Sequence, residues 1–399
     1  MKILVINSGS SSLKYQLINM DDQSVLCKGL CERIGLVGSS ISHKANDKEW
    51  KEDILLPTHA TAFSRMLELM TSGPGAVVAD KSEIAAVGHR VVHGGEKFAG
   101  SVLVTEEMIA AMEELSPLAP LHNPPQIRGI RSAQKVFGPS VPQVGVFDTA
   151  FHQTMPKKAF IFAVPYDFYE KHSIRRYGFH GTSHRYVTQR AAAMLGKPAE
   201  ELKIVTCHLG NGSSIAAVSG GKSADTSMGL TPLGGLMMGT RSGDLDPSVA
   251  TYMAEITGQT GNKMSDLLNT KCGFLGVSGV SSDNRDLEAA AADGNERAQL
   301  AQDMFCYQIK KYIGSYAAAM NGLDAVVFTG GIGENSTGVR AKVCADMDFL
   351  GIKIDKAENA KRGDERDISA ANARVRTLVI PTNEELMIAM DTMALLDGR

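Results

Sequence analysis

The sequence predicts an α/β protein built from two duplicated domains. Apolar runs of strand length alternate with longer helical patterns, which is typical of α/β chains. A strand, a turn rich in Gly, Ser and Asn, and a second strand occur twice, over residues 3–14 and 204–216. Two copies about 200 residues apart, one near the start of each half, indicate a duplicated domain rather than a short solenoid repeat. We therefore expect a cleft between the two domains.

Length and composition agree with this class. The 399 residues exceed the size at which one hydrophobic core keeps growing, so two domains are expected. Hydrophobic residues make up 43% and charged residues 21%, which argues against disordered and fibrous proteins. The formal net charge is -3, with Lys and Arg spread along the chain. This charge distribution argues against a nucleic acid partner.

The expected strands are short apolar runs. The first covers Ile3 to Ile6 and stops at the polar Asn7, so it is too short for a signal peptide or a membrane span. We interpret it as a strand of a cytoplasmic protein with no membrane partner. The predicted strands cover residues 3–6, 84–92, 144–147, 204–207, 325–328 and 378–380.

Three helices have recognisable starts and ends. A capping residue followed by proline, at residues 123–124 and again at 246–247, predicts the start of two of them. Thr182 or Ser183 can cap the third. Glycine is expected to end each helix, at or near Gly138, Gly258 and Gly196.

The six cysteines are few for the length and lie mostly in apolar runs. This pattern suits buried thiols in a reducing compartment. Cys27 and Cys31 are four positions apart, but no second close pair of Cys or His accompanies them. Core packing is therefore favoured over a zinc site.

Three glycine turns are candidates for phosphate binding, at residues 7–14, 208–213 and 329–335. Glycine lets the backbone approach a ligand, and consecutive N–H groups with Ser and Asn side chains suit phosphate oxygens. Lys14 would add a positive charge. The alternative for either hairpin copy alone is an ordinary Gly-Ser turn. The recurrence of the turn favours phosphate binding.

Two known nucleotide motifs are absent. A Walker A loop ending at residues 221–223 fails because Ala216 holds its first glycine position. A dinucleotide fingerprint starting at Gly331 fails because Ser336 holds its last one. The Asn-x-Ser/Thr triplets at residues 211–213 and 335–337 are interpreted as chance matches, since no secretory signal precedes them.

Polar function is expected to concentrate between His89 and His208, where eight of the ten histidines lie. His-x-x-x-His pairs suggest a metal, but neither pair has a third ligand near it. His180 directly precedes a predicted helix and suits an anion site, although a lone histidine is more often structural. Arg241 lies in the glycine-rich segment 231–246, where it is either a catalytic group on a loop or a surface arginine.

Seven motifs together resemble those of acetate kinases, members of the acetate-and-sugar-kinase, heat-shock-chaperone and actin superfamily. They cover residues 7–14, 88–95, 146–152, 176–184, 208–213, 239–244 and 330–335. The resemblance extends over the whole chain. It implies two actin-like, ribonuclease-H-like domains: residues 1–150 with the C-terminal helix 383–399, and residues 151–382 for nucleotide binding and dimerisation.

The resemblance also implies reversible transfer of the ATP γ-phosphoryl group to acetate, with ATP and ADP as co-substrates, acetyl phosphate as product, Mg²⁺ (or Mn²⁺) and a homodimer. Asn284 departs from members that carry an aromatic there, which leaves open whether this segment stacks on the base. The implied site residues are Asp148, His180 and Arg241 for catalysis; Arg90, Val92, Leu121, Phe179 and Pro232 for the acid; Lys14, His208, Leu209, Gly210, Asn211, Gly212, Asp283, Asn284, Arg285, Gly331, Ile332, Gly333, Glu334 and Asn335 for the nucleotide; and Asn7 and Glu384 for the metal.

Elementary chemistry supports most of these roles. Charge spreads over the equatorial oxygens as a phosphoryl group moves, so an arginine such as Arg241 aimed at them can be worth about 10³ to 10⁵ in rate. Acetate is already ionised near neutral pH, so Asp148, the family's acid/base position, has no proton to remove. We therefore expect Asp148 to orient Arg90, Arg241 or hydrated Mg²⁺.

Two alternatives remain open at this point. The first is a kinase for propionate or another short-chain acid, because a pocket narrowed by Val92 distinguishes acids differing by one methylene by only about 1–3 kcal/mol. The second is a nucleotide-switch binding protein of the same superfamily. The switch would leave Arg90, His180 and Arg241 without a substrate.

Overall fold

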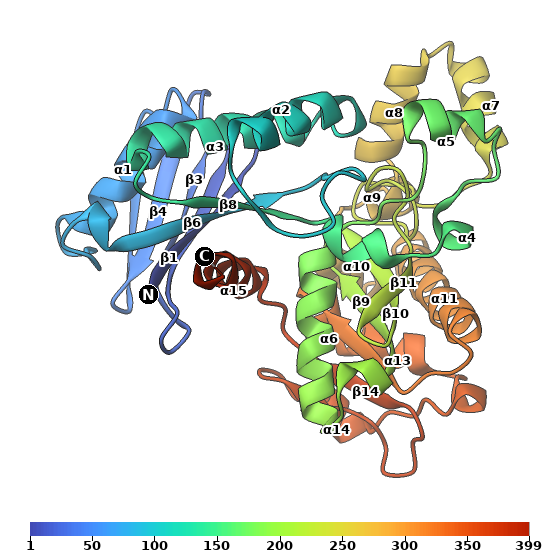
Figure 1. The fold of residues 1–399 in the computed structure, drawn as a ribbon. Helices are drawn as coiled ribbons and strands as arrows, with labels where there is room; N and C mark the ends of the chain where they lie inside the picture. The colour runs from blue at the N-terminus through green and yellow to red at the C-terminus, as the bar shows by residue number, and fades with distance from the viewer. Residues whose placement is uncertain (399) are drawn as a thin grey trace. The chain divides into compact units, whose positions relative to one another are not determined.

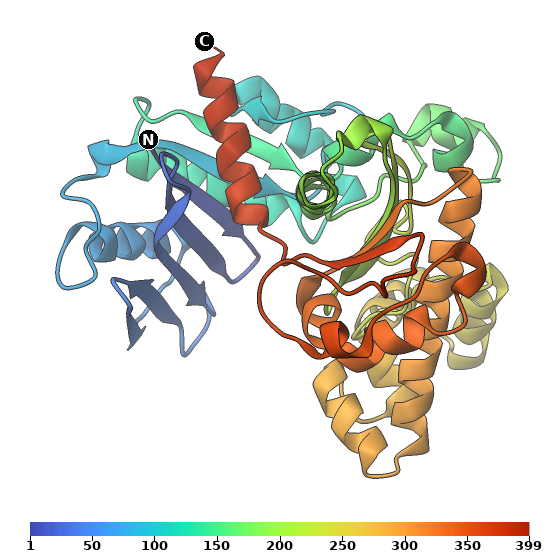
Figure 2. The same ribbon diagram turned by 90° about the horizontal axis from the view of Figure 1, so that it is seen from below.

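The structure is a computed structural model and describes residues 1–398. The chain forms two compact units: unit 1 contains Met1–Phe151 and the chain from Asn383 onward, and unit 2 contains His152–Thr382. Figures 1 and 2 show both units. Within residues 1–398, no helix is long and apolar enough to cross a membrane.

Unit 1 contains an eight-stranded sheet with the order β5-β4-β3-β2-β1-β6-β8-β7. β1 pairs antiparallel with β2 and parallel with β6, and β6 pairs parallel with β8. The strands are β1 Lys2–Ser8, β2 Leu13–Asn19, β3 Ser24–Glu32, β4 Ser40–Ala45, β5 Lys48–Asp53, β6 Ile84–Val91, β7 Val102–Leu103 and β8 Gln143–Phe147.

Helices cover both faces of this sheet. Side chains of a strand alternate between faces, so Leu4 and Ile6 of β1 share one face and enter a core with α1 and α3. On the other face, Ile388 and Thr392 of α15 lie against Gly88 of β6, so closely that a side chain at Gly88 would collide with both. Figure 2 shows α15, in red, along this sheet. The helices are α1 His59–Thr71, α2 Glu106–Leu115, α3 Asn123–Phe137 and α15 Glu384–Asp397.

Unit 2 contains a six-stranded sheet with the order β11-β10-β9-β12-β14-β13. β9 pairs antiparallel with β10 and parallel with β12, and β12 pairs parallel with β14. The strands are β9 Lys203–Leu209, β10 Ser213–Ser219, β11 Lys222–Thr226, β12 Ala325–Thr329, β13 Arg366–Asp367 and β14 Arg376–Val379.

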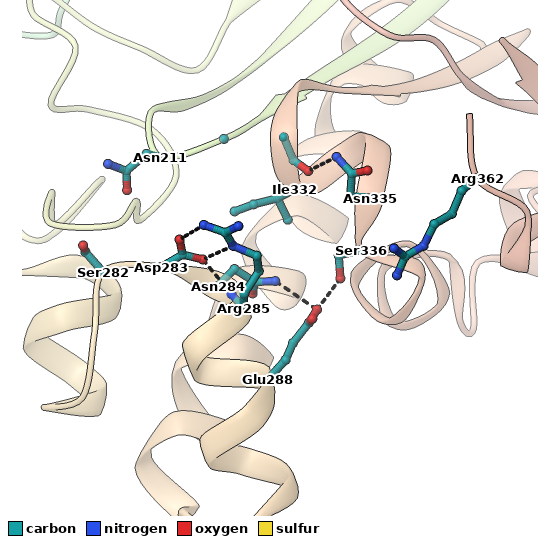
Figure 3. A pocket seen from close by; sticks show the side chains of 12 residues that line it. Asn211, Ser282, Asp283, Asn284, Arg285, Glu288, Ile332, Asn335, Ser336 and Arg362 are labelled. Atoms are coloured by element: carbon teal, nitrogen blue, oxygen red, sulfur yellow. Dashed lines mark hydrogen bonds and ion pairs between the residues drawn. The ribbon is translucent and has the colours of Figure 1, made fainter. Parts of the chain in front are cut away.

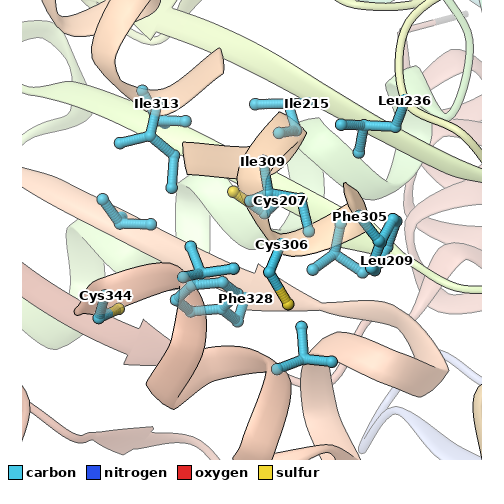
Figure 4. Close-up of a cluster of buried hydrophobic side chains, with 14 of the residues drawn as sticks. Cys207, Leu209, Ile215, Leu236, Phe305, Cys306, Ile309, Ile313, Phe328 and Cys344 are labelled. Atoms are coloured by element: carbon cyan, nitrogen blue, oxygen red, sulfur yellow. The ribbon is translucent and has the colours of Figure 1, made fainter. Parts of the chain in front are cut away.

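The two faces of β9 have different surroundings. Val205, Cys207 and Leu209 point into a hydrophobic core that contains Phe305 and Ile309 of α11 (Figure 4). The alternate residues point to the opposite face, where α6 packs on β9. The helices of unit 2 are α4 Lys157–Phe160, α5 Asp167–His172, α6 Gly181–Leu195, α7 Pro247–Thr257, α8 Gly261–Thr270, α9 Gly273–Ser278, α10 Asn284–Ala292, α11 Glu296–Ala319, α12 Gly330–Asn335, α13 Thr337–Cys344 and α14 Lys356–Ala360.

The predicted duplication is confirmed by the topology. Strands β3-β2-β1-β6-β8 of unit 1 and β11-β10-β9-β12-β14 of unit 2 follow the same order. In both sets the first three strands are antiparallel and the last three are parallel. Unit 1 adds β4 and β5 at one edge and β7 at the other, whereas unit 2 adds only β13.

Two predicted helix starts are wrong by one to three residues. α3 begins at Asn123, and His122 holds the cap position. The Asn123 side chain donates instead to the backbone oxygen of His93 (3.1 Å). α6 begins at Gly181, with His180 at the cap position, so Thr182 and Ser183 lie inside its first turn. The cap at Asp246 and the glycine ends at Gly138, Gly196 and Gly258 are confirmed.

Candidate active site

Unit 1 places the predicted metal residues around one small cavity. Asn7 in β1 and Lys14 in β2 are directly opposite each other in the antiparallel register. Glu384 comes from the first turn of α15. The cavity has a volume of about 50 Å³, which admits a small ion together with water, since one water needs roughly 10–15 Å³ of such space. It is lined by Val5, Asn7, Lys14, Tyr15, Arg90, Glu384, Glu385 and Ile388.

Arg90 is held in place by Asp148. Asp148 directly follows β8, the parallel neighbour of the strand that carries Arg90, so both residues come to the same edge of the sheet. Arg90 Nε donates to Asp148 Oδ1 (3.0 Å) and Arg90 Nη2 donates to Oδ2 (2.8 Å). The backbone N–H of Asp148 donates to Val91 (2.8 Å). Both carboxylate oxygens thus fix the orientation of the guanidinium.

Burial and charge act in opposite directions on this pair. Burial raises the pKa of Asp148, and the Arg90 guanidinium opposes that rise. Burial alone would lower the pKa of Arg90, but the carboxylates of Asp148 and Glu384 outweigh it and raise the pKa. A two-point ion pair compensates both charges inside the protein. The geometry shows that Asp148 and Arg90 hold each other in one fixed arrangement at this edge of the sheet.

The donor set of the cavity fits Mg²⁺ and Mn²⁺. The amide oxygen of Asn7 and the carboxylates of Glu384 and Glu385 line the same space, and both ions prefer oxygen ligands. Glu385 also pairs with Lys14, with 2.5 Å between Oε1 and Nζ. Within residues 1–398 no group of three His, Cys, Asp or Glu side chains could hold a metal. An ion here would therefore rely on water and phosphate oxygens for its remaining ligands, as Mg²⁺ commonly does.

The residues expected to contact the methyl group of the acid are divided between the units. Val92 is half-buried and its backbone N–H donates to Gln126 (3.0 Å). Leu121 is 72% exposed and packs little within unit 1. Phe179 and Pro232 belong to unit 2, where Phe179 is buried. Val92 and Leu121 therefore belong to unit 1, and Phe179 and Pro232 to unit 2.

Unit 2 contains a cavity of about 670 Å³, within the range of roughly 300–1,000 Å³ usual for ligand pockets. Figure 3 shows its lining side chains. It brings together the glycine segments after β9 and β12 and the first turn of α10. The predicted residues that line it are Gly210, Asn211, Asp283, Asn284, Arg285, Gly331, Ile332 and Asn335.

Lys14 belongs to unit 1. Five predicted nucleotide residues of unit 2 do not line this cavity either, and three of them have clear structural roles. Leu209 is fully buried in the core of unit 2. Gly333 lies close under β9, near the backbone oxygen of Cys207. Glu334 Oε1 accepts from the backbone of Gly330 (2.8 Å) and Thr382 (3.1 Å), so it holds the glycine turn. The two remaining residues, His208 and Gly212, lie around His180, as described below.

Four further residues line the cavity that the sequence patterns did not predict: Ser282, Glu288, Ser336 and Arg362. Glu288 Oε1 accepts from Asn284 Nδ2 (2.9 Å) and from Ser336 Oγ (2.5 Å) (Figure 3). Helical spacing could have suggested Glu288, because it follows Asn284 by one turn of α10. Arg362 lies far along the chain from the other three, and no local pattern marks it.

Asn284 does not present a flat surface to the cavity. Its side chain is buried, donates to Glu288 and accepts from Gln302 Nε2 (3.1 Å). One end of the amide is therefore engaged within α10 and the other by α11. Asp283 caps α10 and forms a two-point pair with Arg285, and these hydrogen bonds lower the pKa of Asp283 to about 2. Asp283 and Arg285 thus enter the cavity as a neutralised pair.

Arg241 and His180 converge beside the second glycine turn. A side-chain carbon built on Gly212 would lie 3.6 Å from Arg241 Nη1 and 3.6 Å from His180 Nε2. Arg241 donates to the backbone of Pro232 (3.4 Å), and in the described part of the chain no carboxylate pairs with it. Burial lowers the pKa of Arg241. A partly buried guanidinium without an acidic partner, next to a glycine turn, is suited to an anion.

His180 contacts the side chains of Ser214 and His208 in unit 2. It caps α6 with φ 55°, a left-handed conformation that turns the chain from the Tyr177–Phe179 segment into the helix. Its Nδ1 lies 2.9 Å from Ser214 Oγ. Its ring stacks on His208, with 4.2 Å between ring centres, and His208 Nδ1 lies 2.8 Å from Ser183 Oγ. The predicted position of His180 directly before a helix is confirmed.

Comparison with known proteins identifies the family. The acetokinase family matches residues 2–390. An acetate kinase of Thermotoga petrophila is 58% identical over 400 residues, which cover 100% of this chain and 99% of the relative. An acetate kinase of Desulfitobacterium hafniense is 58% identical and covers 98% of both chains.

Solved structures agree. The crystal structure of an acetate kinase from Porphyromonas gingivalis has a TM-score of 0.96, 51% identity and 99% coverage of both chains. A propionate kinase from Francisella tularensis has a TM-score of 0.92 and 42% identity, covering 98% of this chain and 99% of its own. The expected fold class is thus confirmed, and the chain belongs to the acetokinase family.

Proposed function

We propose that this chain is an acetate kinase, which transfers the γ-phosphoryl group of ATP to acetate and yields acetyl phosphate and ADP. Acetate kinases that are 58% identical over nearly full length support the reaction. One structural observation carries the proposal: Arg241 lies beside the glycine turn at Gly212 without an acidic partner, together with His180. Such a group is ready to stabilise the oxygens of a phosphoryl group in transfer.

The reaction needs no proton transfer. A carboxylate oxygen of acetate attacks the γ-phosphorus, a new O–P bond forms, and the bond from that phosphorus to the β,γ-bridging oxygen breaks. ADP leaves with the electron pair. Because acetate is ionised near neutral pH, no base is required before attack. The same steps in reverse make ATP from acetyl phosphate and ADP.

The residues of unit 1 would hold the acid and the metal. Arg90 binds the acetate carboxylate, and Asp148 orients Arg90. The methyl group contacts Val92 and Leu121, together with Phe179 and Pro232 of unit 2. Asn7 and Glu384 hold Mg²⁺, with Mn²⁺ as a possible substitute, because their oxygens line one cavity. When bound, the ion neutralises charge on the β- and γ-phosphates.

The residues of unit 2 would hold the nucleotide. The cavity along the glycine segments has the volume that a nucleotide needs. Its lining residues Asn211 and Gly331 offer backbone and amide N–H groups to phosphate oxygens. Gly210 closes the turn beside them, since its N–H donates to Gly212 (3.2 Å). Asp283 and Arg285 offer hydrogen-bonding groups nearby, and Ile332 offers an apolar contact. We retain His208, Leu209, Gly212, Asn284, Gly333, Glu334 and Asn335 as parts of this nucleotide site, and Lys14 of unit 1 as a contact of the nucleotide.

A propionate kinase is the second candidate, because a propionate kinase shares 42% identity and the same fold. Apolar pockets separate neighbouring acids by only about 1–3 kcal/mol. We therefore expect measurable propionate activity below that for acetate.

We also propose that the protein is a cytoplasmic homodimer. Val249, Tyr252 and Ile256 form an exposed apolar stripe on α7, and they are 44%, 63% and 64% exposed. An apolar stripe of this kind on a helix suits burial against another chain. Sedimentation of the Tyr252→Asp variant, which should shift toward monomer, tests this role of unit 2. All six cysteines are free thiols, which agrees with a reducing compartment.

Trapping of the acyl phosphate tests the reaction. The protein is incubated with ATP, Mg²⁺ and hydroxylamine, in parallel with acetate, propionate and butyrate. The proposal predicts hydroxamate formation fastest with acetate, slower with propionate and slowest with butyrate. ATP hydrolysis that is independent of any acid would contradict the proposal and favour a nucleotide switch.

A further inference from the structure

Unit 2 contains a path of hydrogen-bonded side chains that leads to His180. The proposed reaction assigns no role to the other members of this path. His180 Nδ1 lies 2.9 Å from Ser214 Oγ. The same hydroxyl lies 2.8 Å from His184 Nε2. His184 Nδ1 in turn lies 2.7 Å from Thr206 Oγ1. Four side chains from three elements thus form one continuous path that ends at His180.

The sequence explains why these side chains meet. Thr206 shares a face of β9 with His208, and Ser214 of β10 is opposite His208 in the register. This is the face on which α6 packs, and His184 follows His180 by one turn at the start of that helix. The other face of β9 and β10 is the apolar core of unit 2. The polar path therefore follows from the alternation of side chains along β9 and β10, which places Thr206 and Ser214 on the face covered by α6.

The surroundings keep His184 neutral. His184, Ser214 and Thr206 are all fully buried. Burial, and then the neighbouring His152 and His208, lower the pKa of His184 well below its ordinary value. A neutral imidazole donates from one nitrogen and accepts at the other. His184 and Ser214 each have one donor and one acceptor in use within the path, so the directions of its hydrogen bonds are linked.

The direction of the path sets the tautomer of His180. The Ser214 hydroxyl has one hydrogen, so it donates to only one of the two imidazoles. If Thr206 donates to His184, then His184 Nε2 donates to Ser214, and Ser214 donates to His180 Nδ1. The hydrogen of neutral His180 is then on Nε2, the atom that lies with Arg241 beside Gly212. The opposite direction would leave a lone pair at Nε2.

We propose that Ser214 and His184 are positioning residues that hold His180 in the tautomer with hydrogen on Nε2. This proposal rests on the phosphoryl transfer proposed above, since a hydrogen on Nε2 lets a neutral histidine donate to a phosphoryl oxygen. Among residues 1–398 the one competing acceptor for Thr206 is the backbone oxygen of Ala216 at 3.5 Å, which is at the limit of a hydrogen bond. Its hydrogen is therefore better placed on His184 at 2.7 Å.

The test removes the bridging hydroxyl with a change of one atom. In Ser214→Ala, His180 Nδ1 loses its donor, so we expect kcat to fall about tenfold or more, the effect of one hydrogen bond to a charged group. The KM values for ATP and acetate should change less than about twofold, because neither binding group is touched. Ser223→Ala is the matched control: its buried hydroxyl lies 2.8 Å from His152 Nδ1, outside this path, and its kcat should match that of the parent.

Nitrogen NMR of protein labelled with ¹⁵N-histidine gives a readout that a merely structural role would not move. The parent should show His180 with a protonated Nε2 and an unprotonated Nδ1, and Ser214→Ala should show both tautomers. A parent His180 with its hydrogen on Nδ1, or a Ser214→Ala variant with unchanged kcat, would overturn the proposal. These outcomes are distinct from failure of the proposed function, which would appear as an absence of trapped acyl phosphate in the parent.

Discussion

The two copies of the duplicated fold differ most in the charges beside their strand ends. In unit 1, Arg90 pairs with Asp148 and Lys14 pairs with Glu385. In unit 2, no carboxylate of the described chain pairs with Arg241. A cation that already has a partner is held in a fixed orientation, whereas an unpaired one attracts an anion. The difference suggests that unit 1 holds the acid and the metal, and unit 2 holds the moving phosphoryl group.

The two hairpin turns both close on themselves and differ in what lies beside them. In unit 1 Gly9 donates to Ser12 (2.9 Å), and a side-chain carbon at Gly9 would come within 2.6 Å of Ser12 Oγ. In unit 2 the corresponding Gly210 donates to Gly212 (3.2 Å). A side-chain carbon at Gly212 would lie 3.6 Å from both Arg241 and His180, so this turn lies beside a cation that has no acidic partner in the described chain.

The largest effect is expected from Arg241. Replacing it by Ala removes the unpaired cation of unit 2, so kcat should fall by about 10³ or more, in line with other arginines that stabilise transferring phosphoryl groups. Steady-state kinetics would measure this fall, and ADP titration should show nearly unchanged nucleotide binding. The Arg241→Lys variant keeps the charge but loses the planar fork and should recover only part of the rate. A loss below tenfold would remove Arg241 from this role.

The next effect concerns the paired charges of unit 1. Arg90→Ala should lower kcat/KM for acetate roughly ten- to a hundredfold, as expected for lost hydrogen bonds between charged groups. If Asp148 acts only by orienting Arg90, Asp148→Asn should lower kcat/KM for acetate in the parent. The same change should leave kcat/KM nearly unaltered in the Arg90→Ala background. The double-mutant cycle measures this coupling. Additive losses would show that Asp148 acts independently of Arg90.

A smaller effect is expected at Val92. Shortening it to Ala should widen the acid pocket and improve propionate relative to acetate by about tenfold, the lower end of the roughly 1–3 kcal/mol that one methylene is worth. The ratio of the two kcat/KM values measures it. An unchanged ratio would exclude Val92 from acid selection.

The smallest effect is expected for the Lys14–Glu385 pair, since the Lys14 side chain is 52% exposed. Glu385→Gln should change the free energy of unfolding by less than about 1 kcal/mol, as usual for exposed ion pairs. Urea denaturation of the two proteins provides the comparison. A loss well above that value would mean that the pair is a structural element of unit 1.

Patterns along the chain were enough to predict the duplicated class and the main strands. In β9, the residues around Cys207 alternate between the apolar core and the opposite face. The cap at Asp246 and the glycine helix ends are local features that need no tertiary contact. The start of α6 was predicted too late because Ser183 looks like a cap. Its hydroxyl instead lies 2.8 Å from His208, a contact between segments far apart in the sequence.

Site residues that belong to a local motif could be predicted from the sequence. Contacts that depend on the packing of distant segments could not. Arg90, Asp148 and His180 were expected from motifs in which strands or loops meet turns. The partnership of Arg90 with Asp148 depends on the parallel pairing of β6 with β8, which no local pattern shows. Glu288 and Arg362 were missed for the same reason, because only the fold brings them to the cavity of unit 2.

Metal-free nucleotide binding tests the division of labour between the units most directly. ADP is titrated calorimetrically, with EDTA present, into the parent, Asn7→Ala and Gly331→Val. Nothing lies within 4 Å of a side-chain carbon at Gly331, so valine would fill the unit 2 cavity without disturbing its walls. We predict parent-like affinity for Asn7→Ala and an affinity at least about tenfold weaker, or 1.4 kcal/mol, for Gly331→Val. Equal weakening in both variants, or weakening in Asn7→Ala alone, would contradict the account.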